Sequence, residues 1–247
     1  MAITKAEKIE KVEELHYDVY WHWGFIWKKA GSGVLNLWKE HDFRNNERMH
    51  GQLCGRSHSI VETIMKVRDT LECWYDPNMI PIEYVKKTNE GSYKAVERNL
   101  YRTFTNGKPL LPANVDSTQV DIYRWRVKKG SDEAHHSVDA VGYDMLSIFY
   151  VIRNLDFSQM KVGEKMQFRI HAGVKGKWLH VTYRGKGKCT LKNGRQYDAL
   201  ELELTFPSKD ADSTPLHVWL AATPDHRPLS VIIQLKRIGA IQGEIVE

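Results

Sequence analysis

Residues 15–38, LHYDVYWHWGFIWKKAGSGVLNLW, decide how the chain folds. Their first half alternates with a period of two, which is typical of a half-buried strand. One face would carry Leu15, Tyr17, Val19, Trp21 and Trp23, and the other His16, Asp18, Tyr20 and His22. Gly24 interrupts the pattern, and the small residues 30–33 permit a bulge before a second extended run continues. We therefore predict a bent opening hairpin whose large aromatic residues either anchor a core or line a pocket.

Similar alternating runs, separated by turn signals, continue along most of the chain. The turn signals are Asn45-Asn46, Pro77-Asn78, Asn89-Glu90-Gly91, Lys175-Gly176, Asn193-Gly194 and Thr223-Pro224-Asp225. Asn-Gly between two such runs is a strong hairpin signal and matches a type I′ turn. Residues 105–118 are the most linker-like, either a loop over a cavity mouth or a crossing between sheet segments.

Two segments carry a helical pattern instead. Ser59 followed by Glu62 resembles a capping box for a short helix ending near Asp69. Residues 141–155 repeat apolar side chains at three- and four-residue spacing and predict the clearest helix. Residues 1–14 are a polar lead-in, helical or frayed, before a single domain over 15–247. About a dozen strands and two short helices indicate an all-β fold, a strongly curved antiparallel sheet forming a barrel or half-barrel.

Composition excludes several classes of protein. The 247 residues are 42 % hydrophobic, enough for a substantial core, and no run of about 18 apolar residues predicts a membrane-spanning helix. The net charge of +5 is modest and the basic residues are scattered, so we expect no nucleic-acid partner. The charged N-terminus lacks the apolar segment of a signal peptide, as would a chain that begins after signal removal.

Cysteine and histidine spacing indicates neither a metal site nor a cofactor. Cys54, Cys73 and Cys189 form no C-x-x-C pair, so a zinc cage of the usual spacing is absent. Cys54 and Cys73 could form a disulfide in an oxidising compartment, while three reduced, buried cysteines are at least as plausible. His135-His136, His171 and His180 lack a supporting carboxylate spacing, and we expect them to be loop residues.

Several segments, in order, resemble a known family. These are DMLSIFYVIRNLD (144–156), KVGEKMQFRIHAGVKGKWLHVTY (161–183), the Gly185–Cys189 element and LHVWLAATPDHRPLSVIIQLKRIGAIQGEI (216–245), together with the opening 15–33. This order is similar to the bacterial exported-protein family called domain of unknown function 3108, over about residues 15–246. The resemblance implies a curved barrel-like fold similar to an outer-membrane capsule lipoprotein, and a periplasmic or outer-membrane-associated location. It supplies no established reaction, so no catalytic residue is carried over.

The candidate ligand-binding residues combine aromatic and basic side chains. Tryptophan can stack on a sugar or hold an acyl chain, and arginine can bind a carboxylate or phosphate. Alternation puts Tyr123 and Trp125 on one face of their strand and Arg124 and Arg126 on the other. The full set is Trp21, Trp23, Trp27, Tyr123, Arg124, Trp125, Arg126, Tyr150 and Arg153. The alternative is that the aromatic residues are core and the arginines form surface ion pairs.

Two functional hypotheses follow from these residues. The favoured one is a non-catalytic cell-envelope protein that binds a glycan or lipid, or supports assembly at the outer membrane. The other is a carbohydrate-active enzyme, such as a polysaccharide lyase, with a Tyr or His base and an Arg converging in one cleft. The usual catalytic motifs, including H-E-x-x-H, G-x-S-x-G and the P-loop, do not occur.

Overall fold

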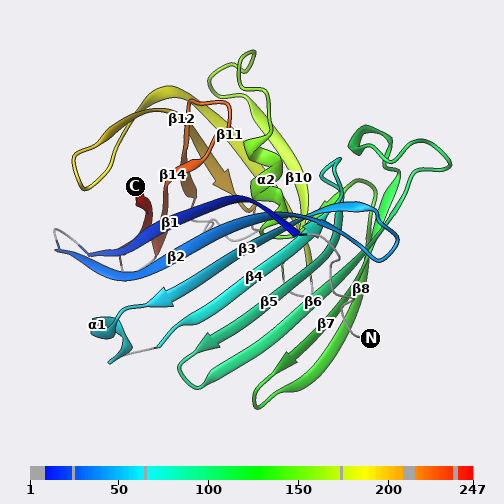
Figure 1. Ribbon diagram of the computed structural model, residues 1–247, viewed down its shortest axis with the longest axis horizontal. Coiled ribbons are helices and arrows are strands. Elements are labelled where there is room, and N and C mark those ends of the chain that lie inside the picture. The colour runs from blue at the N-terminus through cyan, green and yellow to red at the C-terminus, as the bar shows by residue number, and fades with distance from the viewer. Residues whose placement is uncertain are drawn as a thin grey trace.

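A computed structural model describes residues 9–23, 26–63, 66–172, 175–207, 215–235 and 239–246. Within them a single 15-stranded sheet curves around on itself, with β1 (Ile9–Trp23) at its middle (Figure 1). On one side of β1 the strands follow in chain order: β2 (Ile26–His41), β3 (Glu47–Ser57), β4 (Arg68–Tyr75), β5 (Pro81–Glu90), β6 (Tyr93–Phe104), β7 (Ser117–Arg126) and β8 (Gly130–Val138).

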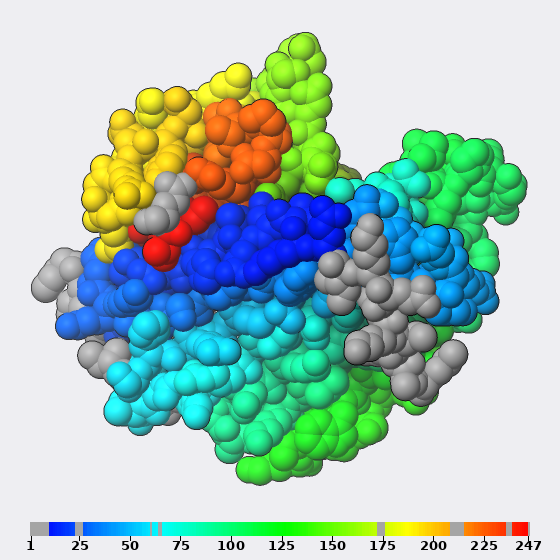
Figure 2. Space-filling view, viewed as in Figure 1, coloured from blue at the N-terminus to red at the C-terminus, as the bar shows by residue number. Residues whose placement is uncertain are grey.

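On the other side of β1 the order runs backward from the C-terminus. The strands are β15 (Gly239–Val246), β14 (Pro228–Leu235), β13 (Leu216–Ala221), β12 (Gln196–Thr205), β11 (Lys175–Thr190), β10 (Lys165–Ala172) and β9 (Gly142–Tyr143). The space-filling view shows β1 and β2 crossing the molecule between these two groups of strands (Figure 2). The opening hairpin therefore joins the two halves of the sheet.

The predicted hairpin is confirmed. Tyr17 pairs with Gly33 and Val19 with Gly31, and the register then shifts between Val19 and Tyr20, at the small residues where a bulge was expected. The prediction that residues 1–14 form a helical or frayed lead-in is wrong for residues 9–14, because β1 already begins at Ile9, which pairs with Glu40. A second register shift between Lys11 and Glu13 explains the difference: it breaks the alternation that would have revealed the strand.

The all-β, strongly curved sheet is also confirmed, and it nearly closes into a barrel. Its two edge strands are β8 and β9. The Thr118 hydroxyl on β7 donates to the Ala140 carbonyl oxygen at 2.8 Å and accepts from the Gly142 amide at 3.2 Å. Since β9 pairs in parallel with β10, these two bonds bring the ends of the sheet together. We call this junction the seam.

Both helices are shorter than expected. Helix α2 (Ser147–Arg153) begins late because residues 142–143 pair with β10 instead, and Asp144 Oδ1 accepts the amides of Leu146 and Ser147. Helix α1 (Ser59–Glu62) has no side-chain cap, since the Glu62 carboxylate binds Arg68 and Ser57 rather than closing a capping box. The 105–118 connection joins neighbouring strands β6 and β7 and contains a 3₁₀ turn, Pro112–Asn114.

Two local predictions need correction. Asn193-Gly194 does form a hairpin turn, but Gly194 alone has a positive φ, at 84°, whereas a type I′ turn requires both. Cys54 and Cys73 do not bridge: all three cysteines are free thiols. The Cys54 thiol contacts Gln52 on the outer face, whereas the Cys73 thiol faces Gly51 on the inner face, so the two point apart.

Helix α2 lies inside the curve of the sheet and divides its core (Figure 1). Ile148 and Ile152 pack in one hydrophobic cluster, with the inward residues of β10–β13. Leu146 and Tyr150 pack in another, with the inward residues of β2 and β4–β7. The helix therefore fills one end of the barrel, which we call the closed end.

Candidate functional site: an apolar cavity

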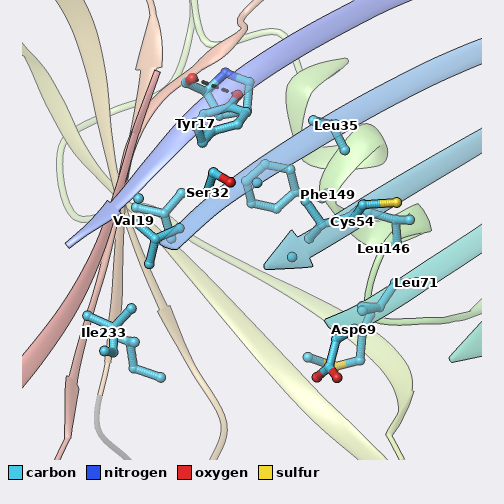
Figure 3. A pocket seen from close by; sticks show the side chains of 18 of the residues that line it. Tyr17, Val19, Ser32, Leu35, Cys54, Asp69, Leu71, Leu146, Phe149 and Ile233 are labelled. Carbon is cyan, nitrogen blue, oxygen red and sulfur yellow. Dashed lines mark hydrogen bonds between the residues drawn. The ribbon is translucent and has the colours of Figure 1, made fainter. Parts of the chain in front are cut away.

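A cavity of about 480 Å³ lies between the two halves of the sheet, next to α2 (Figure 3). Its size is within the range of about 300–1,000 Å³ that is usual for small-molecule sites. Strands on both sides of β1 contribute to its wall. The side chains that define it include Tyr17, Val19, Leu35, Leu53, Leu71, Met145, Leu146, Phe149, Leu216, Val231, Ile233 and Ile241.

Glycines at inward positions explain why the space is hollow. Gly33 pairs with Tyr17 on one side and with Gly55 on the other, so two neighbouring strands lack side chains in the same row. Gly243 sits between Val19 and Val231, which both line the cavity. A Cβ atom added at Gly55 or Gly243 would meet no atom within 4 Å. The cavity therefore exists because the inner face of the sheet is left unfilled at these points.

Of the polar side chains on the cavity wall, Tyr17 and Asp69 have partners within the protein, and Ser32 adds one hydroxyl group (Figure 3). The Tyr17 hydroxyl donates to the Pro228 carbonyl oxygen at 2.9 Å, and burial raises its pKa far above the usual value. Asp69 Oδ1 accepts the Asn89 amide at 2.8 Å. Since the remaining wall is dominated by Leu, Ile, Val, Phe and Met, the cavity suits an apolar ligand.

Tyr150 and Arg153 of α2 hold the helix in place. The Tyr150 hydroxyl donates to the Asn36 carbonyl oxygen at 3.0 Å. The Arg153 guanidinium binds both carboxylate oxygens of Glu13, at 2.8 and 2.6 Å, and the Asp225 carbonyl oxygen at 3.1 Å. Burial raises the pKa of Tyr150, so its hydroxyl stays protonated. These two predicted ligand-binding residues contribute to the closed end, and neither lines the cavity.

The three predicted tryptophans do not form one surface. Trp21 is half-buried and pairs with Ile241, so it lies on the inner face, next to the cavity wall. Trp27 lies on the outer face, where its ring stacks on His22 at 4.0 Å and Lys192 Nζ lies 3.4 Å from its centre. The side chain of Trp23 is outside the described residues.

The predicted alternation in β7 is present but places these residues away from the cavity. Tyr123 and Trp125 are exposed on the outer face. Arg124 and Arg126 lie on the face that buries Val120 and Ile122, and both pair with Asp132, at 2.5 and 3.2 Å. The eight predicted site residues whose side chains are described are thus divided among the opening hairpin, β7 and α2, and their role in binding stays a prediction.

Histidines at the seam form a separate polar cluster. His171 is fully buried, neither of its ring nitrogens has a hydrogen-bond partner, and its ring centre lies 6.1 Å from that of His136. Burial, with smaller contributions from His136 and Arg169, lowers the pKa of His171 to about 4, so its ring is neutral. Among the described residues, no group of three or more His, Cys, Asp or Glu side chains could hold a metal ion.

Sequence reasoning missed the cavity because its wall is assembled from both ends of the chain. Residues between Tyr17 and Leu71 meet residues between Leu216 and Gly243. The available signal was the glycines of β3, whose inward series is Met49, Gly51, Leu53 and Gly55. Gly33 belongs to the Gly-Ser-Gly element, where the small residues predict a bulge or bend.

The fold and its cavity define a β-barrel-like protein with a hollow, helix-capped interior. The chain belongs to the family described as protein of unknown function (DUF3108), whose model matches residues 16–246. Among solved structures it is similar to the β-barrel-like protein of domain of unknown function DUF1849 from Brucella abortus. That likeness has a TM-score of 0.52 at 7 % identity, covering 100 % of this chain and 98 % of the other, and it shows the fold alone. No protein with a curated description matches the chain.

The helices of the described residues are all too short to cross a membrane.

Proposed function

We propose that the protein is a non-catalytic binding protein that takes the acyl chain of a lipid into the apolar cavity. The cavity of about 480 Å³, with its aliphatic and aromatic wall, is the observation that carries this proposal. Each methylene group moved from water into such a space gains about 0.8 kcal/mol. An apolar chain is therefore the ligand that this wall would bind most favourably.

The chemistry of the wall favours a lipid over a glycan. A sugar needs several hydrogen-bonding groups directed at it, whereas the Tyr17 hydroxyl and the Asp69 carboxylate already have partners. The lyase alternative needs a Tyr or His and an Arg in one cleft, but the wall formed by the described residues contains no Arg or His. Binding without catalysis is the simpler use of this cavity.

We also propose a cell-envelope location, periplasmic or associated with the outer membrane, as the family resemblance implies. A protein that shields an acyl chain would serve there to hold or move lipid across an aqueous compartment. Fractionation of cells that produce the protein from its own gene tests this location directly.

Filling the hollow tests the proposed function. Gly55→Phe and Gly243→Phe each place a ring where an added Cβ meets nothing, so the fold should accept them. Gly187→Phe is the matched control, since it adds the same ring at an exposed position on β11 where a Cβ also meets nothing. Binding would be measured by titrating each protein with a fluorescent fatty acid and displacing it with unlabelled palmitate.

We expect Gly55→Phe and Gly243→Phe to weaken binding by about tenfold or more, since each ring displaces at least two methylene groups of ligand. Gly187→Phe should bind like the unmodified protein. Equal affinity in all four proteins, or no binding to any of them, would contradict the proposal.

A further inference from the structure

The cavity extends from α2 toward the opposite end of the barrel, which we call the open end. At its closed end the wall is made by Leu146, just before the helix, and by Phe149 of the helix. At the other end it reaches Val67, beside the start of β4, and Leu216 and Ile233, near the β12–β13 and β14–β15 connections. Met145, beside Leu146, also lines the cavity and is 39 % exposed.

At this end of the barrel, neighbouring strands are connected in the pairs β1–β2, β3–β4, β5–β6, β7–β8, β10–β11, β12–β13 and β14–β15. Figure 1 shows α1 and the β5–β6 and β7–β8 turns along one edge of the sheet, with α2 toward the other. Seven exposed cations on or next to these connections form what we call the basic rim: Lys28, Arg56, Lys66, Lys94, Lys128, Lys129 and Lys177.

The cations of the basic rim are not neutralised by the protein. None of the seven forms an ion pair among the residues that the structure describes. Among the described acids nearby, Glu62 binds Arg68, Asp132 binds Arg124 and Arg126, and Asp69 accepts the Asn89 amide. Glu90, at the end of β5, forms no ion pair among the described residues. The rim therefore presents unpaired positive charge around the opening of an apolar cavity.

The closed end differs in charge. Its described connections carry eight acids and seven bases. The acids are Asp42, Asp76, Asp116, Asp139, Asp144, Asp156, Glu164 and Asp225, and the bases are Arg44, Lys108, Arg153, Lys161, Lys192, Arg195 and Arg227.

We propose that the basic rim docks the open end of the barrel on an anionic phospholipid membrane. This inference rests on the proposed function, because docking in this orientation brings the cavity against the surface from which an acyl chain would enter. Negatively charged headgroups attract basic residues near the membrane surface, and a ring of cations orients the opening toward the bilayer. The acyl chain then need not cross water to reach the cavity.

Vesicle binding tests the docking surface. The protein would be floated with vesicles of phosphatidylcholine alone and with vesicles of phosphatidylcholine and phosphatidylglycerol in equal amounts. The rim variant combines Lys94→Gln, Lys128→Gln and Lys129→Gln. The matched control combines Arg44→Gln, Lys108→Gln and Lys161→Gln, which removes the same charge from exposed positions at the closed end.

We expect binding to the mixed vesicles only, and a loss of roughly 100-fold in the rim variant, since each cation near the surface contributes about fivefold. The control should lose far less, and added salt should weaken binding of the unmodified protein. Equal losses in the two variants would overturn the docking surface, as would equal binding to phosphatidylcholine alone. Displacement from the mixed vesicles by RNA at the same salt would assign the rim to polyanions instead and would also overturn it.

The two proposals can fail separately. The rim variant should keep its affinity for a monomeric fluorescent fatty acid, and Gly243→Phe should keep its binding to mixed vesicles. If no protein binds the fatty acid while the rim still controls vesicle binding, the acyl-chain function fails and the docking surface stands. If fatty-acid binding follows the cavity variants but vesicle binding ignores the rim, the docking surface alone fails.

Discussion

The closed and open ends of the barrel are built on the same strands but filled differently. On β3, Gly51 lies where an added Cβ would come within 2.5 Å of the Tyr150 ring and 3.0 Å of the Cys73 sulfur. Gly55 lies four residues further on the same face, and there an added Cβ would meet nothing within 4 Å. One glycine makes room for α2 and the other leaves a hollow. The difference shows that identical residues in one strand can serve packing at one end and a cavity at the other.

The largest effect should come from releasing α2 at the closed end. Arg153→Met removes the guanidinium that binds Glu13 with two hydrogen bonds, and leaves a mostly buried carboxylate without its partner. We expect a loss of about 3–5 kcal/mol in the free energy of unfolding, measured by denaturant titration. Arg102→Met is the control, because the Arg102–Asp121 pair is exposed and should contribute at most about 1 kcal/mol. Equal losses would show that α2 is not held by this pair.

The pH dependence of stability should report the buried Asp144 at the start of α2. Burial raises its pKa from 3.8 to about 6, despite the hydrogen bonds from Ser147 and Leu146 that favour the charged form. The folded protein thus binds a proton that the unfolded chain has lost, and this group makes stability fall as pH rises from about 4 to about 6. Asp144→Asn should therefore be the more stable protein at pH 7, by at most about 3 kcal/mol, and show no advantage below pH 4.

His171 at the seam acts in the opposite sense. Its pKa is lowered from 6.5 to about 4, so the stability it contributes is present above about pH 6.5 and is lost as pH falls toward 4. In the Asp144→Asn variant, Asp144 no longer offsets the effect of His171, so the stability of the variant should rise as the pH increases from about 4 to about 6.5. Thermal unfolding of the unmodified protein and of the variant from pH 4 to pH 7.5 measures the difference. Parallel curves for the two proteins would show that Asp144 does not cause the pH dependence predicted for it.

A smaller effect should separate the two glycines of β3. Gly51→Ala should destabilise the protein by about 1–3 kcal/mol, because the added methyl group overlaps the Tyr150 ring and overpacks the closed end. Gly55→Ala should change stability by less than about 0.5 kcal/mol, since its methyl group enters open space. Chemical denaturation of the two variants is sufficient, and similar values would mean that the ends are packed alike.

The sequence predicted the fold well because alternation and turn signals are local. Leu15, Tyr17 and Val19 face inward as their alternation indicates, and the bulge falls at the small residues of β2. The extent of the helix was not predictable from its apolar spacing, because the pairing of Gly142 and Tyr143 with β10 takes the first residues of the pattern. Tertiary pairing overrode a local preference there.

The site was less predictable, since a cavity is defined by where distant strands meet. Gly243 and Gly55 are far apart in sequence, and their shared role depends on the order β3-β2-β1-β15 in the sheet. The sequence analysis selected aromatic and basic residues because their side chains can bind ligands, yet Trp125 is exposed and Arg153 is bound to Glu13. The cavity wall instead consists mainly of aliphatic residues and glycines, and these residue types do not distinguish a cavity from an ordinary hydrophobic core.

The central claim is that an acyl chain occupies the cavity, and a thiol introduced there tests it most directly. Gly55→Cys places a thiol inside the cavity, and Gly187→Cys places one at an exposed position on β11. The alkylation rates at positions 55 and 187 would be compared by peptide mass spectrometry with and without palmitate. The account predicts that palmitate slows alkylation at position 55 and leaves the rate at position 187 unchanged. An unchanged rate at position 55 under saturating palmitate would contradict it.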